Sequence, residues 1–218
     1  MKNKTLLTSI ATSAVLATIT NAAVIANFTF TGSTRASSDT DVDTIVSNIT
    51  DGSGLVGSYQ TDDDSGDGFA NAELSPDNTP SLRTTYGQVN TANDTLADAI
   101  SANHYFTFTI TSTGGASVDY QNLTLSIAKL GPVGDNDLPG RGPTVYVFAG
   151  DFSGGGPTIG DVLGSQVIPD TPTVTGDLFN ADVDLSSLTG ITGATEFRLY
   201  LDNGGASNTG HRIILDDI

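Results

Sequence analysis

Several residue types that carry common chemistries are absent or rare in this chain. It has no cysteine and no tryptophan, and only 8 Lys and Arg residues against 25 Asp and Glu, for a formal net charge of -17. Without cysteine there can be no disulfide bond, thiol nucleophile or thiolate zinc site. A chain this acidic would be repelled by a phosphate backbone, which excludes nucleic acid as a partner.

The shortage extends to the residues that favour helices. Glu73 and Glu196 are the only two Glu residues, and Met occurs once, whereas Gly occurs 25 times. Thr, Val, Gly and Asp, which suit strands and turns, are plentiful. Because 218 residues can also bury a substantial core, the composition predicts one all-β domain.

Residues 1–23 have the pattern of a secretory signal peptide. Lys2 and Lys4 precede a small and apolar run, residues 6–19, that is too short and too rich in Thr and Ser to span a membrane. Signal peptidase could cleave after Ala22, after Ala23 or after Ala26, and we favour cleavage after Ala23. We expect a secreted or cell-surface protein with no second membrane segment, and losing both lysines takes its formal charge from -17 to -19.

Short runs of alternating apolar and polar residues, bounded by Gly, Pro, Asn and Asp, follow the leader. This pattern predicts a two-sheet antiparallel β-sandwich of jelly-roll type with about eight strands, formed by residues 24–218. The expected strands cover residues 26–31, 104–111, 120–130, 144–149, 163–168, 178–185, 196–201 and 211–218. Seven residues at alternating positions are expected in the core: Phe106, Phe108, Ile110, Leu125, Val147, Phe197 and Leu199.

Two regions depart from the strand pattern. Residues 94–102 predict one short helix, with Leu96, Ala99 and Ile100 on one face and Asp94 as its cap. Residues 33–93 are polar and rich in Asp, and we expect long loops there with one or two weak edge strands.

Three groups of Asp residues are candidate Ca²⁺ ligands, because closely spaced carboxylates in a loop can converge on a hard cation. The first group is Asp39, Asp41 and Asp43, the second contains Asp63 and Asp67, and the third is Asp135 and Asp137 in a loop rich in Gly and Pro. Neither of the first two groups matches an EF-hand, since the closing Glu is missing from both. The alternative is that each group forms solvated turns, which Asp favours by bonding to its own backbone.

No catalytic arrangement is evident in the sequence. There is no Gly-x-Ser-x-Gly elbow and no phosphate-binding loop, and His104 and His211 are far apart. We therefore expect no catalytic residues and no enzyme activity. A carbohydrate site remains open: tryptophan, a common stacking residue for sugars, is absent, but Tyr59 and Tyr86 lie in loop-like sequence and are candidate ligand-binding residues.

Most of residues 22–218 resembles exported bacterial proteins of the PEP-CTERM class. The resemblance is carried by the sequences AAVIANFTFTG from Ala22, ASSDTD from Ala36, AISANHYFTF from Ala99, VDLSSLTG from Val183, EFRLY from Glu196, GHR from Gly210 and LDDI from Leu215. It implies an exported jelly-roll domain associated with the cell envelope or an extracellular polysaccharide matrix. The Pro-Glu-Pro motif, membrane helix and basic end of that class are not found before Ile218, so this chain is either a fragment or a released member.

The final LDDI sequence is also similar to the last strand of galactose-binding and other carbohydrate-binding jelly rolls. That resemblance implies Asp216 and Asp217 as ligands of a structural Ca²⁺, although a polar edge strand would look the same. The leading hypothesis is thus a non-enzymatic secreted module that binds or organises polysaccharide. The alternatives are a self-associating component of a surface layer or extracellular matrix and, second, a glycan-active hydrolase.

Overall fold

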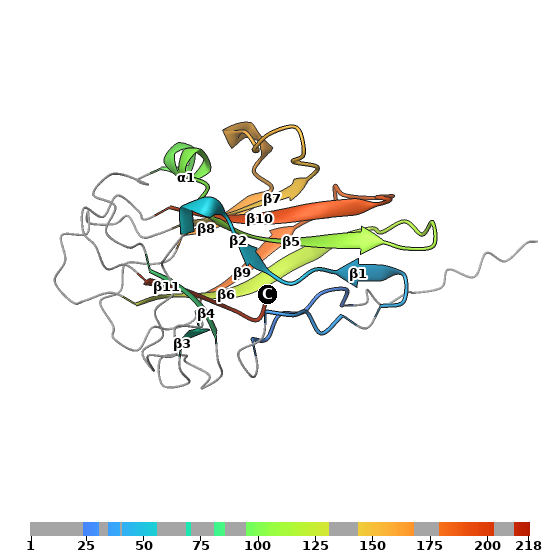
Figure 1. Ribbon diagram of the computed structural model, residues 1–218, viewed down its shortest axis with the longest axis horizontal. Coiled ribbons are helices and arrows are strands. Elements are labelled where there is room, and N and C mark those ends of the chain that lie inside the picture. The colour runs from blue at the N-terminus through green and yellow to red at the C-terminus, as the bar shows by residue number, and fades with distance from the viewer. Residues whose placement is uncertain are drawn as a thin grey trace, which may run out of the picture.

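Two antiparallel sheets pack face to face in the computed structural model, which describes residues 24–30, 35–39, 41–55, 69–70, 81–85, 95–130, 144–167, 179–202 and 212–218. In Figure 1, sheet A lies above sheet B. Sheet A contains β1 (Thr44–Val46), β2 (Thr50–Asp51), β5 (Tyr105–Ser112), β7 (Thr144–Gly150), β8 (Gly164–Val167) and β10 (Ala194–Asp202). Sheet B contains β3 (Phe69–Ala70), β4 (Ser81–Thr85), β6 (Asn122–Leu130), β9 (Phe179–Asp184) and β11 (Arg212–Asp216).

The strand order is that of a jelly roll. Sheet B runs β4-β11-β6-β9 after the short edge strand β3, and sheet A runs β5-β10-β7-β8 after the edge strand β1. Strands β4 to β11 thus supply four strands to each sheet, and the chain changes sheet at every connection among them except the β7–β8 hairpin. The predicted eight-stranded jelly-roll sandwich is confirmed, with β1, β2 and β3 added to it.

Alternating apolar residues place the core between the sheets. On β5, Phe106, Phe108 and Ile110 are at most 4% exposed, whereas the intervening residues point outward. Phe197 of β10 lies opposite Phe108, and their rings stack with centroids 5.1 Å apart. All seven predicted core residues are buried in this one cluster, as expected from the period of two along each strand.

The predicted strand at residues 26–31 is wrong within its described part. Residues 24–30 form an irregular segment in which Phe28 exchanges two backbone hydrogen bonds with Ile218, of 2.8 and 3.2 Å. Phe30 then adopts a left-handed conformation with φ of 52°, which breaks any ladder. Phe28 and Phe30 are nevertheless fully buried, so the alternation correctly predicted burial but not pairing.

The region expected to hold loops and weak edge strands contributes to both sheets. Within its described residues, β1 and β3 are edge strands, but β4 pairs with β3 on one side and β11 on the other. β4 therefore replaces residues 26–31 as the first strand of the jelly roll. Its sequence, SLRTT, is too short and polar to show the apolar alternation of the other strands.

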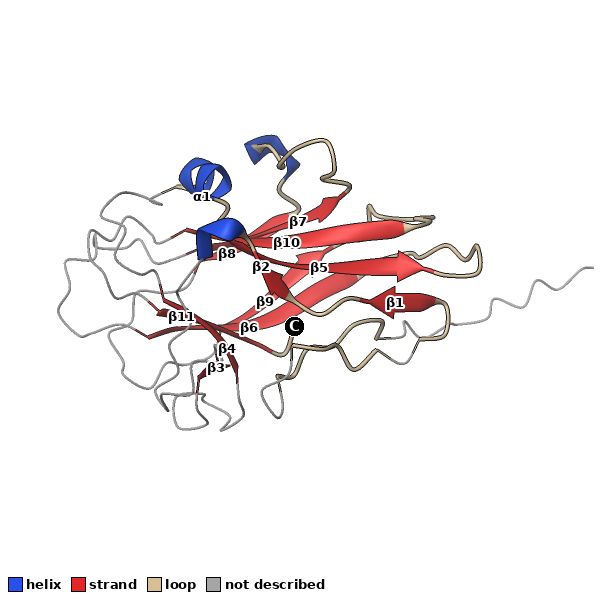
Figure 2. Ribbon diagram, viewed as in Figure 1, coloured by secondary structure: helices blue, strands red, loops and turns tan. Residues whose placement is uncertain are grey.

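Among the described residues there is one α-helix, which is short and covers the outer face of sheet A (Figures 1 and 2). α1 (Leu96–Ala102) begins at Thr95, whose side chain accepts a hydrogen bond from the Asp98 amide, so Thr95 and not Asp94 is the cap. Leu96 and Ala99 are buried, as predicted. The turns η1 (Ser53–Leu55) and η2 (Ile159–Asp161) are 3-10 helices, and no helix of the described residues is long and apolar enough to cross a membrane.

Candidate functional site

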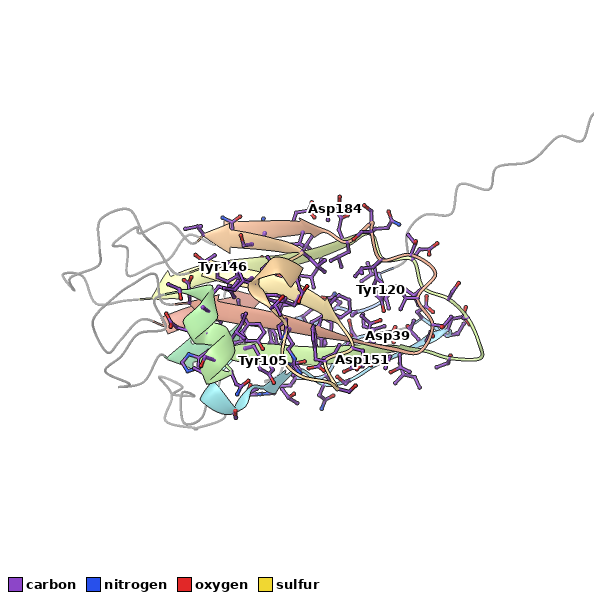
Figure 3. The ribbon with its side chains drawn as sticks, turned by 90° about the horizontal axis from the view of Figure 1, so that it is seen from above. Asp39, Tyr105, Tyr120, Tyr146, Asp151 and Asp184 are labelled. Carbon is purple, nitrogen blue, oxygen red and sulfur yellow. The ribbon has the colours of Figure 1, made fainter. Side chains whose placement is uncertain are left out.

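A groove of about 850 Å³ opens beside the N-terminal segment and is the candidate site. One wall is formed by residues 24–26, a second by Asp41, Asp43 and Thr44, and a third by residues 117–124, which lead into β6. This volume is within the range of small-molecule sites. In Figure 3, Asp39 and Tyr120, which mark this part of the chain, lie away from α1.

Aromatic rings form the floor of the groove. Phe28, Phe108 and Phe197 line it, and each is at most 3% exposed. The Phe28 and Phe108 rings are 5.0 Å apart, and Tyr120 meets Phe197 edge to face at 5.3 Å. Because these rings also belong to the main core, the floor is held rigidly by both sheets.

Polar side chains form the rim. Two of its carboxylates are held by backbone amides: Asp41 Oδ1 accepts from the Asp43 N–H at 2.8 Å, and Asp119 Oδ1 accepts from the Gly190 N–H at 2.6 Å. Gln121, Asn122 and Thr124 are exposed on the third wall. The rim thus offers both hydrogen-bond acceptors and donors above an apolar floor.

Tyr120 connects the floor to the rim. It is 5% exposed, and burial raises the pKa of its hydroxyl above the ordinary 10.0, with a hydrogen bond to Thr195 partly offsetting the shift. The hydroxyl therefore stays protonated at neutral pH. Tyr120 is a neutral, packed wall of the groove, with no role as a base.

The outer face of sheet A carries a second group of aromatic residues, beneath α1 and the loop that follows β7. Phe148 and Tyr200 are fully buried there, with ring centroids 5.3 Å apart. Tyr105 lies 4.8 Å from Tyr200, and Figure 3 shows Tyr105 and Tyr146 on this face. The outer face of sheet B differs, because hydrogen-bonded pairs such as Asn122 with Asp182 occupy it.

Arg198 is fixed between aromatic rings on this outer face of sheet A. Its guanidinium carbon is 4.7 Å from the Tyr105 ring centroid and 4.5 Å from that of Phe152, and its Nε donates to Glu196 at 2.6 Å. Burial alone would lower the pKa of Arg198, but hydrogen bonds to Glu196 and Tyr200 and the charge of Glu196 outweigh it and raise the pKa. Arg198 is therefore a permanently charged, stacked and paired side chain that stabilises the sheet.

The structure describes the side chains of four predicted metal ligands, Asp39, Asp41, Asp43 and Asp217. Asp39 Oδ1 accepts from the Asp41 N–H and Asp41 in turn accepts from Asp43, so this run forms successive Asp turns. Asp217 is exposed and has a φ of 46°. Across the part of the chain that the structure describes, no three His, Asp or Glu residues are arranged to hold a metal ion. Outside that part lie Asp63, Asp67, Asp135, Asp137, Tyr59, Tyr86 and the side chain of Asp216.

The groove includes residues that the sequence did not indicate. Asp41 and Asp43 were candidates for a metal site, but Asp119, Tyr120 and Asn122 were assigned no role. Tyr120 was expected to begin a strand, whereas β6 begins at Asn122 and residues 117–121 form the wall. No local motif marks these residues, since the groove exists only where the N-terminal segment packs beside them.

No family model and no curated protein matches the chain, so membership of the PEP-CTERM class stays a prediction. Solved structures with a distant likeness include the K1 and K3 cleaved adhesin domains of Lys-gingipain from Porphyromonas gingivalis W83. K1 is 11% identical with a TM-score of 0.34, covering 81% of this chain and 89% of that one. K3 is 12% identical with a TM-score of 0.37, covering 88% and 94%.

A third distant likeness is to TmCBM61 in complex with beta-1,4-galactotriose. It is 10% identical with a TM-score of 0.28, covering 80% of this chain and 84% of that one. At these scores the similarities carry no argument about this chain. The fold assignment rests on the chain's own strand order, and function has to be argued from the groove.

Proposed function

We propose that this chain is a secreted, non-enzymatic jelly-roll module that binds extracellular or cell-surface polysaccharide in the groove. The observation that carries the proposal is one cavity of about 850 Å³ that joins an apolar wall, residues 24–26 beside the packed aromatic rings, to a rim of amide, hydroxyl and carboxylate groups. Sugar rings present apolar C–H faces and hydroxyl groups together, and such a lining matches both. The leader-like residues 1–23 support export.

Binding in the groove fits the groups that the rim leaves available. Within the described part of the chain, no hydrogen bond engages the carboxylate of Asp43 or the side chains of Gln121 and Thr124. All three are exposed groove residues. A sugar hydroxyl can donate to the carboxylate and accept from the amide, so one ring can satisfy both kinds of group.

A glycan array on the exported chain tests this function. Gln121→Ala should weaken binding of any glycan that the array identifies by about fivefold, the equivalent of one hydrogen bond. Gln166→Ala on β8 is the matched control, because the Gln166 side chain donates to the neighbouring carbonyl of Val167 and is not among the groove residues that the structure describes. Flat, variant-independent signals across all glycans would contradict the proposal.

The hydrolase alternative is disfavoured by exposure. Asp41, Asp43 and Asp119 line the groove, but Asp43 and Asp119 are exposed, and a general acid needs a carboxyl group shielded from water. We expect no release of reducing ends from a bound glycan, and such release would revive the hydrolase alternative.

Self-association remains a second candidate function because of one edge strand. β1 ends sheet A; Ile45 within it is 63% exposed, and Val42, just before it, is 88% exposed. Exposed apolar residues on an open edge favour pairing with another chain. If this edge mediates self-association, Ile45→Lys should reduce the oligomer fraction measured by analytical ultracentrifugation without affecting glycan binding.

A further inference from the structure

We infer that the groove takes glycans without anionic groups, an inference that rests on the proposed function and specifies its substrate class. The charge of the lining is one-sided. Three carboxylates, those of Asp41, Asp43 and Asp119, line the groove, and its other described lining residues include no Lys, Arg or His. A uronate or sulfate group placed there would meet these three negative charges, opposed only by the α-ammonium group that cleavage after Ala23 would leave on Val24.

Two of the three negative charges are fixed in place. The Asp41 carboxylate is held by the Asp43 amide and the Asp119 carboxylate by the Gly190 amide, so neither is free to swing away from a bound anion. The Asp43 backbone is held, since its carbonyl accepts from the Thr113 N–H at 2.8 Å, but its exposed carboxylate can rotate. Repulsion by Asp41 and Asp119 therefore cannot be relieved by a simple change of side-chain position.

The two basic side chains that the structure describes, those of Arg35 and Arg198, are already paired with carboxylates. Arg35 pairs with Asp51 at 2.9 Å, and Arg198 pairs with Glu196 on the outer face of sheet A, away from the groove lining. The chain as a whole carries a formal charge of -17, which adds a long-range repulsion of polyanions. Local and overall charge thus act in the same direction.

The same residues suit an uncharged sugar. Carboxylate oxygens accept hydrogen bonds from hydroxyl groups, and the Gln121 amide can donate in return. Val24, Ile25 and Ala26 give the groove an accessible apolar surface that needs no charge from the ligand. Uncharged glycans therefore keep every favourable contact and avoid the repulsion.

The test uses pairs of polymers that differ in charge on one backbone. Affinity electrophoresis would compare methyl-esterified with de-esterified homogalacturonan, hydroxyethyl cellulose with carboxymethyl cellulose, and dextran with dextran sulfate. The neutral member of any pair that is retained should bind at least about tenfold more tightly at low salt, and the difference should shrink at 0.5 M NaCl as charges are screened.

Variants locate the effect in the groove. Asp43→Asn and Asp119→Asn should each reduce the ratio of neutral-polymer affinity to anionic-polymer affinity about threefold. Asp161→Asn, which removes an equal charge from an exposed turn outside the groove, should leave the ratio unchanged.

The possible outcomes distinguish a failure of the proposed function from a failure of the inference that the groove takes uncharged glycans. If none of these polymers and no glycan of the array is retained, the proposed function fails, and this inference fails with it. If an anionic polymer binds as tightly as its neutral partner, the proposed function survives and the inference is overturned. An equal effect of Asp161→Asn would also overturn it, because the selectivity would then come from net charge alone.

Discussion

Replacement of Phe28 by Ala tests whether the N-terminal segment is part of the folded domain. Phe28 is 0% exposed, packs 5.0 Å from Phe108 and exchanges backbone hydrogen bonds with Ile218. Truncating a buried Phe to Ala costs about 3–5 kcal/mol. Because Phe28 also lines the groove, the space left behind opens to water and is not sealed as a cavity, so we expect a value near the lower end, about 3 kcal/mol.

Urea unfolding followed by circular dichroism measures this loss. With an m-value of about 2 kcal/mol/M, a loss of about 3 kcal/mol lowers the midpoint by about 1.5 M. Phe106→Ala is the comparison, since Phe106 is equally buried in the same core but does not line the groove, and should cost about 4–5 kcal/mol.

Comparison of the two variants shows whether residues 24–30 unfold together with the sandwich. A Phe28→Ala loss below about 1 kcal/mol beside a full loss for Phe106→Ala would show that residues 24–30 do not unfold cooperatively with the sandwich, which would refute the packing described here.

Four further outcomes are expected. Gly54→Ala should cost at least about 2 kcal/mol, because a Cβ there would overlap the Ala102 carbonyl and the His104 ring, whereas Gly154→Ala, with open space around it, should be neutral. Burial lowers the pKa of His104 below 6.5, so the folded state binds its proton less readily, and stability present above pH 6.5 should be lost as the pH falls. His104→Gln should reduce that slope in melting temperatures between pH 7.5 and 5.5. Intact mass should show the exported chain beginning at Val24; a start at Asn27 would contradict this, since Ile25 and Ala26 pack against the core. Millimolar CaCl₂ should raise the melting temperature more than NaCl of equal ionic strength if the Asp groups hold an ion, and equal shifts would identify them as solvated turns.

Local pattern alone was sufficient to predict the class of fold. The period of two in HYFTFTIT and EFRLYL placed Phe106, Phe108, Phe197 and Leu199 in the core, because successive side chains of any strand point to opposite faces. Seven of the eight predicted strands lie within a few residues of β5 to β11. Composition likewise indicated an all-β chain with one short helix.

Tertiary structure decided which segments pair. Residues 26–31 had the stronger strand pattern, yet their two Phe side chains pack into the core without a ladder, while the polar SLRTT of β4 became a jelly-roll strand. Pairing depends on which edge of a sheet a segment reaches, and β4 is held by backbone hydrogen bonds to β3 and β11 that any sequence can make.

The groove shows the same division between sequence and structure. The sequence supplied the carboxylates of Asp41 and Asp43, and their spacing indicated turns or an ion site. Only the folded chain brings them beside Asp119 and Tyr120, more than 70 residues further along, above rings contributed by the N-terminal segment, β5 and β10. A surface assembled from segments so far apart leaves no local periodicity or motif, because its members are neighbours only after the two sheets have packed.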